Sequence, residues 1–188
     1  MDIEIQKKWF KNHVAKFTDL GKIKILDFQK PESSSYKIRF LFDEENCNLH
    51  ISGDLGECVA TNYSNMTYEG FKDFVHDFSY FRSKIDCCSR DIFTYDVDEA
   101  RKYLEEEFKE NDFDFSEQGY ESAEEAIEDI LEDFTDIKGI SNDGYDVLKK
   151  FDSDAWEWAS SVGKVSTGII ETYLLAFELA TEQLKRQE

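Results

Sequence analysis

Residues 22–52, KIKILDFQKPESSSYKIRFLFDEENCNLHIS, contain three short segments in which apolar and polar residues alternate. The segments are residues 22–30, 35–42 and 48–52, and the turn-forming sequences PESSS and DEEN separate them. This alternation is typical of β-strands, because successive side chains of a strand point to opposite faces of a sheet. The pattern predicts an antiparallel β-meander, which continues through a turn at residues 53–56, GDLG, into a fourth strand at residues 57–61, ECVAT.

Helical patterns lie on both sides of this meander. At the N-terminus, residues 2–17 are expected to form a helix because four apolar residues fall on one face at helical spacing: Ile3, Phe10, Val14 and Phe17. After the meander, Thr67 is expected to cap a short helix over residues 68–78. The apolar face of that helix is formed by Phe71, Phe74, Val75 and Phe78.

The second half of the chain is predicted to be helical. Asp96 with Glu99, and Ser122 with Glu125, have the spacing of N-terminal capping boxes. Further helices are expected at residues 143–151, 153–161 and about 166–185. We therefore predict one α+β domain over residues 1–188: an N-terminal helix, an antiparallel meander of about four strands, and a helical half. Its near-neutral, sheet-containing half is residues 1–95, and its acidic helical half is residues 96–188.

Composition excludes a disordered chain and a membrane-spanning one. Of the 188 residues, 40% are hydrophobic, including 16 Phe, 9 Tyr and 3 Trp, which is enough to form a core despite the net charge of −20. The longest apolar stretch, GIIETYLLAFELA, contains two Glu and is too short to cross a bilayer. The four cysteines contain no Cys-x-x-Cys pair, so we expect free structural thiols in a reducing cytoplasm, with no metal site and no cofactor.

The charge is distributed unevenly along the chain. Residues 1–90 contain 14 acidic and 13 basic residues, whereas residues 91–188 contain 28 and 9. Residues 91–136 alone contain 19 acidic and 3 basic residues, a net charge of −16. Like charges at this density repel one another and exceed what solubility requires. The acidic segment is therefore the strongest functional signal in the sequence.

Carboxylates three or four residues apart on a helix lie roughly 5–6 Å apart, close to the spacing of about 6–7 Å between phosphates along a nucleic-acid strand. A helix over residues 122–134 could thus imitate a nucleic-acid backbone and bind the basic groove of a protein. The alternative is a solvated face that only keeps the protein soluble. The acidic residues proposed to contact a partner are Glu105, Glu106, Glu121, Glu124, Glu125, Glu128, Asp129, Glu132 and Asp133. No direct DNA binding is expected from this acidic half.

Residues 50–90 offer an enzymatic alternative. They contain general acid/base types and cations that could cleave a guide RNA: His50, Glu69, His76, Arg82 and Lys84. Tyr80 lies beside the two cations and could stack on a base. The main alternative for these cations is ion pairing with the acidic half of the chain. A third possibility is sequestration of a small signalling nucleotide, which would require a pocket.

Three segments carry a resemblance to known proteins: LHISGDLGECVA, DFSYFRSKIDCCSRD and DVDEARKYLEEEF. Over about residues 20–110 they resemble small proteins encoded by phages and prophages of Gram-positive bacteria. Small acidic phage proteins of this kind often resemble anti-CRISPR and antirestriction inhibitors, several of which imitate DNA. The resemblance implies a host-defence target, such as an RNA-guided nuclease or its guide RNA, in the host cytoplasm. It does not extend beyond about residue 110, so it does not cover the rest of the acidic segment.

Overall fold

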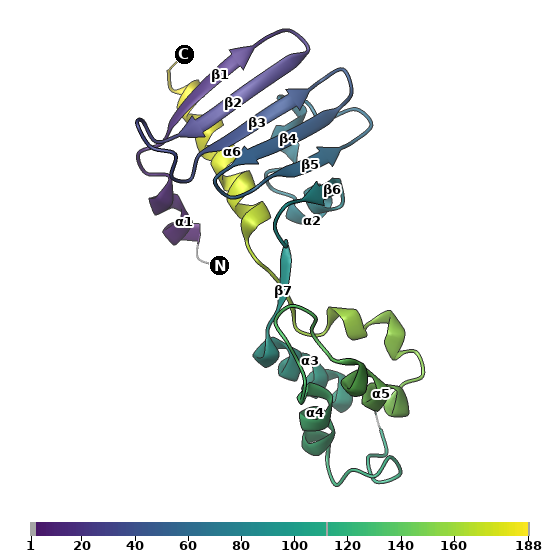
Figure 1. Cartoon of the computed structure of the whole chain (residues 1–188). Coiled ribbons are helices and arrows are strands. Elements are labelled where there is room, and N and C mark those ends of the chain that lie inside the picture. The colour runs from purple at the N-terminus through teal and green to yellow at the C-terminus, as the bar shows by residue number, and fades with distance from the viewer. Residues whose placement is uncertain (1–2, 112, 188) are drawn as a thin grey trace. The chain divides into compact units, whose positions relative to one another are not determined.

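The computed structural model describes residues 3–111 and 113–187, and it forms two compact units (Figure 1). The sheet unit comprises Met1–Ile92 and Gly168–Glu188, and the helical unit comprises Phe93–Thr167. This division differs from the predicted single domain with halves meeting at residue 95. The last helix lies at the end of the predicted acidic half, residues 96–188, but belongs to the sheet unit, because its apolar residues complete the core beneath the sheet.

The sheet unit confirms the predicted α+β fold with an antiparallel sheet first. Six strands follow one another in sequence order, each antiparallel to its neighbours, where about four were expected. They are β1 (Val14–Asp19), β2 (Ile23–Gln29), β3 (Ile38–Asp43), β4 (Asn48–Gly53), β5 (Cys58–Thr61) and β6 (Ile85–Cys88). The turns between β1 and β5 are short, so strands that pair in the sheet are also consecutive in the sequence. A series of alternating segments was therefore enough to predict the meander.

The N-terminal helix is shorter than predicted. Helix α1 spans only Ile3–Trp9, and the expected helical residues Val14 and Phe17 lie in β1. Val14 is 45% exposed, so it does not share a buried face with Phe10. The segment VAKFTD alternates and forms a hairpin with β2, which favours a strand over a continued helix. Gly21, at φ 80°, allows the turn of that hairpin instead of ending a helix.

One face of the sheet is covered by helices (Figure 1). These are the 3₁₀ turn η1 (Gly70–Asp73), α2 (Phe78–Arg82) and α6 (Ile169–Lys185). Fully buried rings of Phe40, Phe42, Phe71 and Phe177 meet there with centroids 4.8–6.4 Å apart. Thr67 accepts a hydrogen bond from the Gly70 N–H at 3.1 Å as a cap would, but the predicted helix is a single 3₁₀ turn followed by α2.

The helical unit has a separate hydrophobic core. Its elements are β7 (Phe93–Tyr95), α3 (Val97–Glu110), α4 (Ala123–Leu131), α5 (Asn142–Phe151), η2 (Ala155–Glu157), η3 (Ala159–Ser161) and β8 (Lys164–Ser166). Both predicted caps are present: the Asp96 carboxylate accepts from the N–H groups of Asp98 and Glu99, and the Ser122 hydroxyl accepts from that of Glu125. No helix in the described parts of the chain is long and apolar enough to cross a membrane.

Candidate functional site

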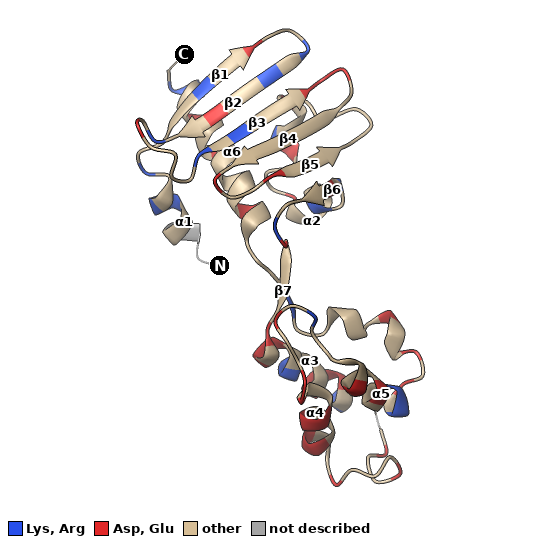
Figure 2. Cartoon of the chain, viewed as in Figure 1, with Lys and Arg blue, Asp and Glu red and all other residues tan. Residues whose placement is uncertain are grey.

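The two units differ strongly in charge (Figure 2). The 75-residue helical unit contains 23 acidic and 7 basic residues, a net charge of −16. The sheet unit contains 19 acidic and 15 basic residues, a net charge of −4. The acidic segment detected in the sequence therefore coincides with most of one folded unit.

Helix α4 separates its acidic and apolar residues cleanly. All nine acidic residues proposed to contact a partner are exposed. The buried positions of α4 are Ala126, Ile127, Ile130 and Leu131, which pack into the core of the helical unit. At about 100° per residue, the carboxylates from Glu121 to Asp133 occupy roughly half of the helix circumference. The helix thus presents a continuous acidic side to solvent.

Few of these carboxylates are neutralised by cations of the same unit. Among its described residues, the ion pairs are Arg101–Glu128 at 2.8 Å, Lys102–Glu99 at 2.6 Å and Lys149–Asp146 at 3.3 Å. The hydrogen bond to Glu128 raises the pKa of Arg101, and the nearby charges of Glu124 and Glu105 raise it further. Because Glu105 is on α3 and the other two acids are on α4, these helices share one acidic surface around Arg101.

Some of the carboxylates are held in place by hydrogen bonds. The Tyr120 hydroxyl donates to Asp129 Oδ2 at 2.6 Å, and the Glu121 N–H donates to Glu125 Oε2 at 2.6 Å. Burial, together with the Asp129 hydrogen bond, raises the pKa of Tyr120 to about 12, so the hydroxyl remains a donor at neutral pH. In the described residues, the side chains of Glu124, Glu132 and Asp133 form no comparable hydrogen bond or ion pair. The acidic surface therefore combines anchored and free carboxylates.

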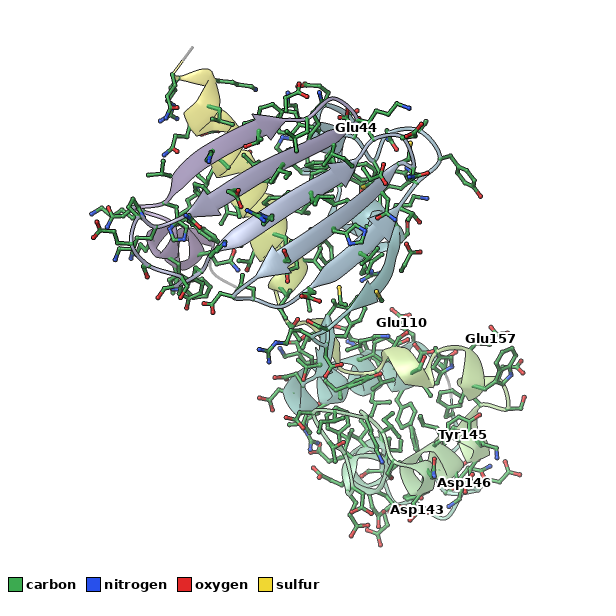
Figure 3. The ribbon with its side chains drawn as sticks, turned by 45° about the horizontal axis from the view of Figure 1, so that its top comes forward. Glu44, Glu110, Asp143, Tyr145, Asp146 and Glu157 are labelled. Atoms are coloured by element: carbon green, nitrogen blue, oxygen red, sulfur yellow. The ribbon has the colours of Figure 1, made fainter. Side chains whose placement is uncertain are left out.

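Further exposed acidic residues of the helical unit were not among those proposed from the sequence. Glu110, Asp143, Asp146 and Glu157 lie at the surface of the helical unit (Figure 3). Glu110 ends α3, and Asp143 and Asp146 lie on α5. The highest density of acids still lies on α3 and α4, where carboxylates repeat every three or four residues.

The structure does not bring together the two main residues of the proposed ribonuclease site. His50 lies on β4 between the buried residues Leu49 and Ile51, so its side chain points to the face that the sheet unit leaves uncovered. Glu69 lies on the opposite, covered side, where it pairs with Lys72. A general acid and base on opposite faces of a sheet cannot act on one phosphodiester.

The other proposed residues of that site lie near α2. His76 is exposed between η1 and α2. Arg82 ends α2 with its guanidinium 5.7 Å from the centroid of the Phe78 ring, and the Lys84 ammonium lies 4.7 Å from that of Tyr80. The expected proximity of Lys84 to Tyr80 is thus present. Arg82 lies in α2, and Lys84 lies in the short connection before β6 begins at Ile85.

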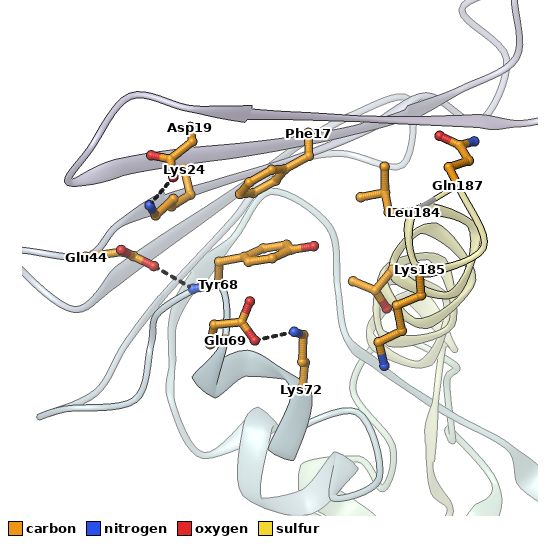
Figure 4. Close-up of a pocket in the computed structure, with 11 residues that line it drawn as sticks. Phe17, Asp19, Lys24, Glu44, Tyr68, Glu69, Lys72, Leu184, Lys185 and Gln187 are labelled. Atoms are coloured by element: carbon orange, nitrogen blue, oxygen red, sulfur yellow. Dashed lines mark hydrogen bonds and ion pairs between the residues drawn. The ribbon is translucent and has the colours of Figure 1, made fainter.

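A pocket of about 690 Å³ lies in the sheet unit and was not predicted (Figure 4). It is lined by Phe17, Asp19, Lys24, Glu44, Tyr68, Glu69, Lys72, Thr181, Leu184, Lys185 and Gln187. The Phe17 and Tyr68 rings pack with centroids 4.3 Å apart, and Lys24 pairs with Asp19 at 2.6 Å. The lining comes from five separate segments of the chain, so no local sequence pattern could have indicated it. Its three carboxylates and three ammonium groups balance.

In the described residues, no group of three or more His, Cys, Asp or Glu side chains is placed to hold a metal ion. Comparison with protein-family models, curated proteins and solved structures finds no match to this chain. The acidic surface and the pocket are therefore the features that can support a functional proposal.

Proposed function

We propose that the chain is an inhibitory binding protein whose helical unit occupies the basic nucleic-acid groove of another protein. The observation that carries this proposal is the net charge of −16 within one folded unit of 75 residues, on a surface with few internal ion pairs. A charge of this density would attract a basic groove over a long range and release the counterions bound there. Inhibition then follows because the groove can no longer accept DNA or RNA.

The proposed partner is a nucleic-acid-targeting defence enzyme of a bacterial host, such as an RNA-guided nuclease. This assignment rests on the resemblance of residues 20–110 to phage and prophage proteins, which implies a protein of the host cytoplasm. The acidic unit would bind the enzyme rather than its DNA or RNA, because phosphates and carboxylates repel. Complex formation should weaken as salt is added, since the attraction is largely Coulombic.

Two charge-reversed variants test the proposal. Glu124, Glu132 and Asp133 are changed to Lys in the first, because among the described residues none of these side chains forms a hydrogen bond or ion pair that the reversal would break. The control variant carries Glu57→Lys, Asp73→Lys and Asp86→Lys, which are exposed positions of the sheet unit. Both variants have the same formal net charge of −14. A difference in potency between the two variants therefore reports where the charges were reversed and not the total charge of the protein.

The assay is inhibition of DNA binding by a panel of purified RNA-guided nucleases and restriction enzymes, with the wild-type chain identifying the susceptible enzyme. We expect the helical-unit variant to lose at least about tenfold in inhibitory potency, since each lost interface charge pair costs on the order of 1 kcal/mol. The control variant should retain most of its potency. Equal potency of both variants would show that the acidic surface is not the binding surface.

The pocket supports a second candidate, sequestration of a small signalling nucleotide. Its volume of about 690 Å³ lies within the range of small-molecule sites. Phe17 and Tyr68 could contact a base, and Lys72 and Lys185 could contact phosphate. The carboxylates of the lining oppose an anionic ligand, so this candidate is weaker than the first. This candidate is tested by equilibrium dialysis against radiolabelled cyclic nucleotides. The amount of nucleotide bound is compared between the wild-type chain and Lys185→Glu.

A further inference from the structure

Two cysteines face each other directly across neighbouring strands. Cys58 on β5 is the register partner of Cys88 on β6 in an antiparallel pair. The adjacent pair, Glu57 and Ser89, is joined by a backbone hydrogen bond from the Ser89 N–H to the Glu57 carbonyl at 2.8 Å. Hydrogen-bonded and non-hydrogen-bonded pairs alternate along an antiparallel ladder. Cys58 and Cys88 therefore occupy a non-hydrogen-bonded pair, in which the side chains approach most closely.

The spacing expected for such a pair falls within the range that disulfides span. The Cα atoms of a non-hydrogen-bonded pair lie about 4.5 Å apart, and disulfides span Cα separations of about 4.4–6.8 Å. Both side chains point to the same face of the sheet, where Cys58 is buried and Cys88 is half-buried. The thiols are close enough to perturb each other's titration, although burial is the main cause of the raised pKa of each.

The other two cysteines are poorly placed for the same reaction. Cys87 is exposed and opposes Val59, and strand alternation directs its side chain away from that of Cys88. Cys47 lies between β3 and β4, where its thiol donates to the Glu44 carbonyl. Only Cys58 and Cys88, of the four thiols, are opposed across a strand pair.

We propose that Cys58 and Cys88 form a reversible modification site, at which a peroxide converts the two thiols into a cross-strand disulfide. The half-buried Cys88 thiol loses its proton, and the thiolate attacks one oxygen of hydrogen peroxide, which breaks the O–O bond and leaves a sulfenic acid. The released hydroxide takes up the thiol proton and becomes water. The Cys58 sulfur then attacks the Cys88 sulfur, so that an S–S bond forms and the hydroxyl leaves as water. In total, two thiols lose two electrons and two protons, and one peroxide becomes two waters.

The disulfide would link β6, the last strand of the sheet, covalently to β5. Strand β6 pairs only with β5, and the register shifts between Val59 and Ala60, so this is the least regular pairing of the sheet. A bond between Cys58 and Cys88 closes a loop of about 30 residues, which restricts the unfolded chain. We expect oxidation to raise the melting temperature of the sheet unit by about 10 °C.

The test uses the full chain carrying Cys47→Ser and Cys87→Ser, so that the opposed pair supplies the only two thiols. The protein is treated with hydrogen peroxide, alkylated with a maleimide and measured by intact mass spectrometry and thermal denaturation. We expect a monomer that has lost two hydrogens, takes up no maleimide and melts at higher temperature, with all three effects reversed by a thiol reductant. The matched control adds Cys88→Ser and should show no change in melting temperature with peroxide.

Two results would overturn the proposal. One is full maleimide labelling of both thiols under conditions that oxidise a small dithiol completely. The other is a disulfide between two copies of the chain in place of the internal bond. If Cys88→Ser does not fold, peptide mapping of the peroxide-treated wild-type chain replaces it. A link that joins Cys58 to Cys87, or none at all, then counts against the proposal.

Discussion

Replacing Glu132 by Gln should stabilise the helical unit, although it removes a charged residue from an exposed position. Glu132 is the C-terminal cap of α4, and the last turn of this helix contains no basic residue. The carbonyl groups at a helix C-terminus carry partial negative charge, so a carboxylate there is unfavourable. Glu128 and Asp129 lie one turn earlier on the same side and add like-charge repulsion.

The size of the effect follows from these contacts. A charge at a helix terminus contributes about 0.3–1 kcal/mol at low ionic strength, and each like-charge pair at this spacing about 0.2–0.5 kcal/mol. Together they predict a gain of about 1 kcal/mol in the free energy of unfolding. With a denaturant slope of roughly 1 kcal/mol/M for a unit of this size, the urea midpoint should rise by about 1 M.

The assay is urea denaturation followed by tryptophan fluorescence in a Trp9→Phe background, in which the remaining Trp156 and Trp158 report on the helical unit. Glu125→Gln is the matched control, because it removes the same charge from the first turn of α4. There the carboxylate accepts the Glu121 N–H and interacts favourably with the helix terminus, so its loss should destabilise by about 0.5–1 kcal/mol. Both effects should shrink in 0.5 M salt, a concentration at which the Debye length is only about 4 Å.

A neutral or destabilising effect of Glu132→Gln at low salt, or effects of the same sign for both substitutions, would contradict an unfavourable charge at the C-terminus of α4. A gain at Glu132 would mean that the unit tolerates an unfavourable charge. Such a cost is expected where a surface serves binding rather than stability.

Two further predictions concern the sheet unit. Phe177→Ala should lower its free energy of unfolding by about 3–5 kcal/mol, because the ring is fully buried among other Phe rings. The control Phe177→Leu should lower it by only about 1 kcal/mol. Equal losses for the two variants in chemical denaturation would contradict this packing. Burial lowers the pKa of His13 below its ordinary value of 6.5, so the neutral form stabilises the fold above pH 6.5 and this contribution is lost as the pH falls below it. His13→Gln should therefore make the melting temperature depend less on pH between 6.5 and 5. If the variant shows the same pH dependence as the wild-type chain, burial of His13 is not the cause of that dependence.

Local sequence patterns located most of the secondary structure. Strands β2 to β5 were predictable because each is a short alternating segment bounded by turn residues. Helices α3 and α4 were predictable because Asp96 and Ser122 are capping residues followed by an acid three positions later. The N-terminal segment was misassigned because VAKF satisfies a helical spacing as well as an alternating one. Pairing with β2, a contact that no local pattern expresses, favours the strand.

The α+β class, the antiparallel meander and the concentration of negative charge after residue 90 could be inferred from the order of residues, because these features depend on residues close together in the chain. Three other features became visible only in the folded chain: α6 returns to the sheet, His50 and Glu69 lie on opposite faces, and Cys58 opposes Cys88. Each of these depends on contacts between residues far apart in sequence. Such contacts are set by burial of apolar surface and by strand register, which act only once the chain is folded.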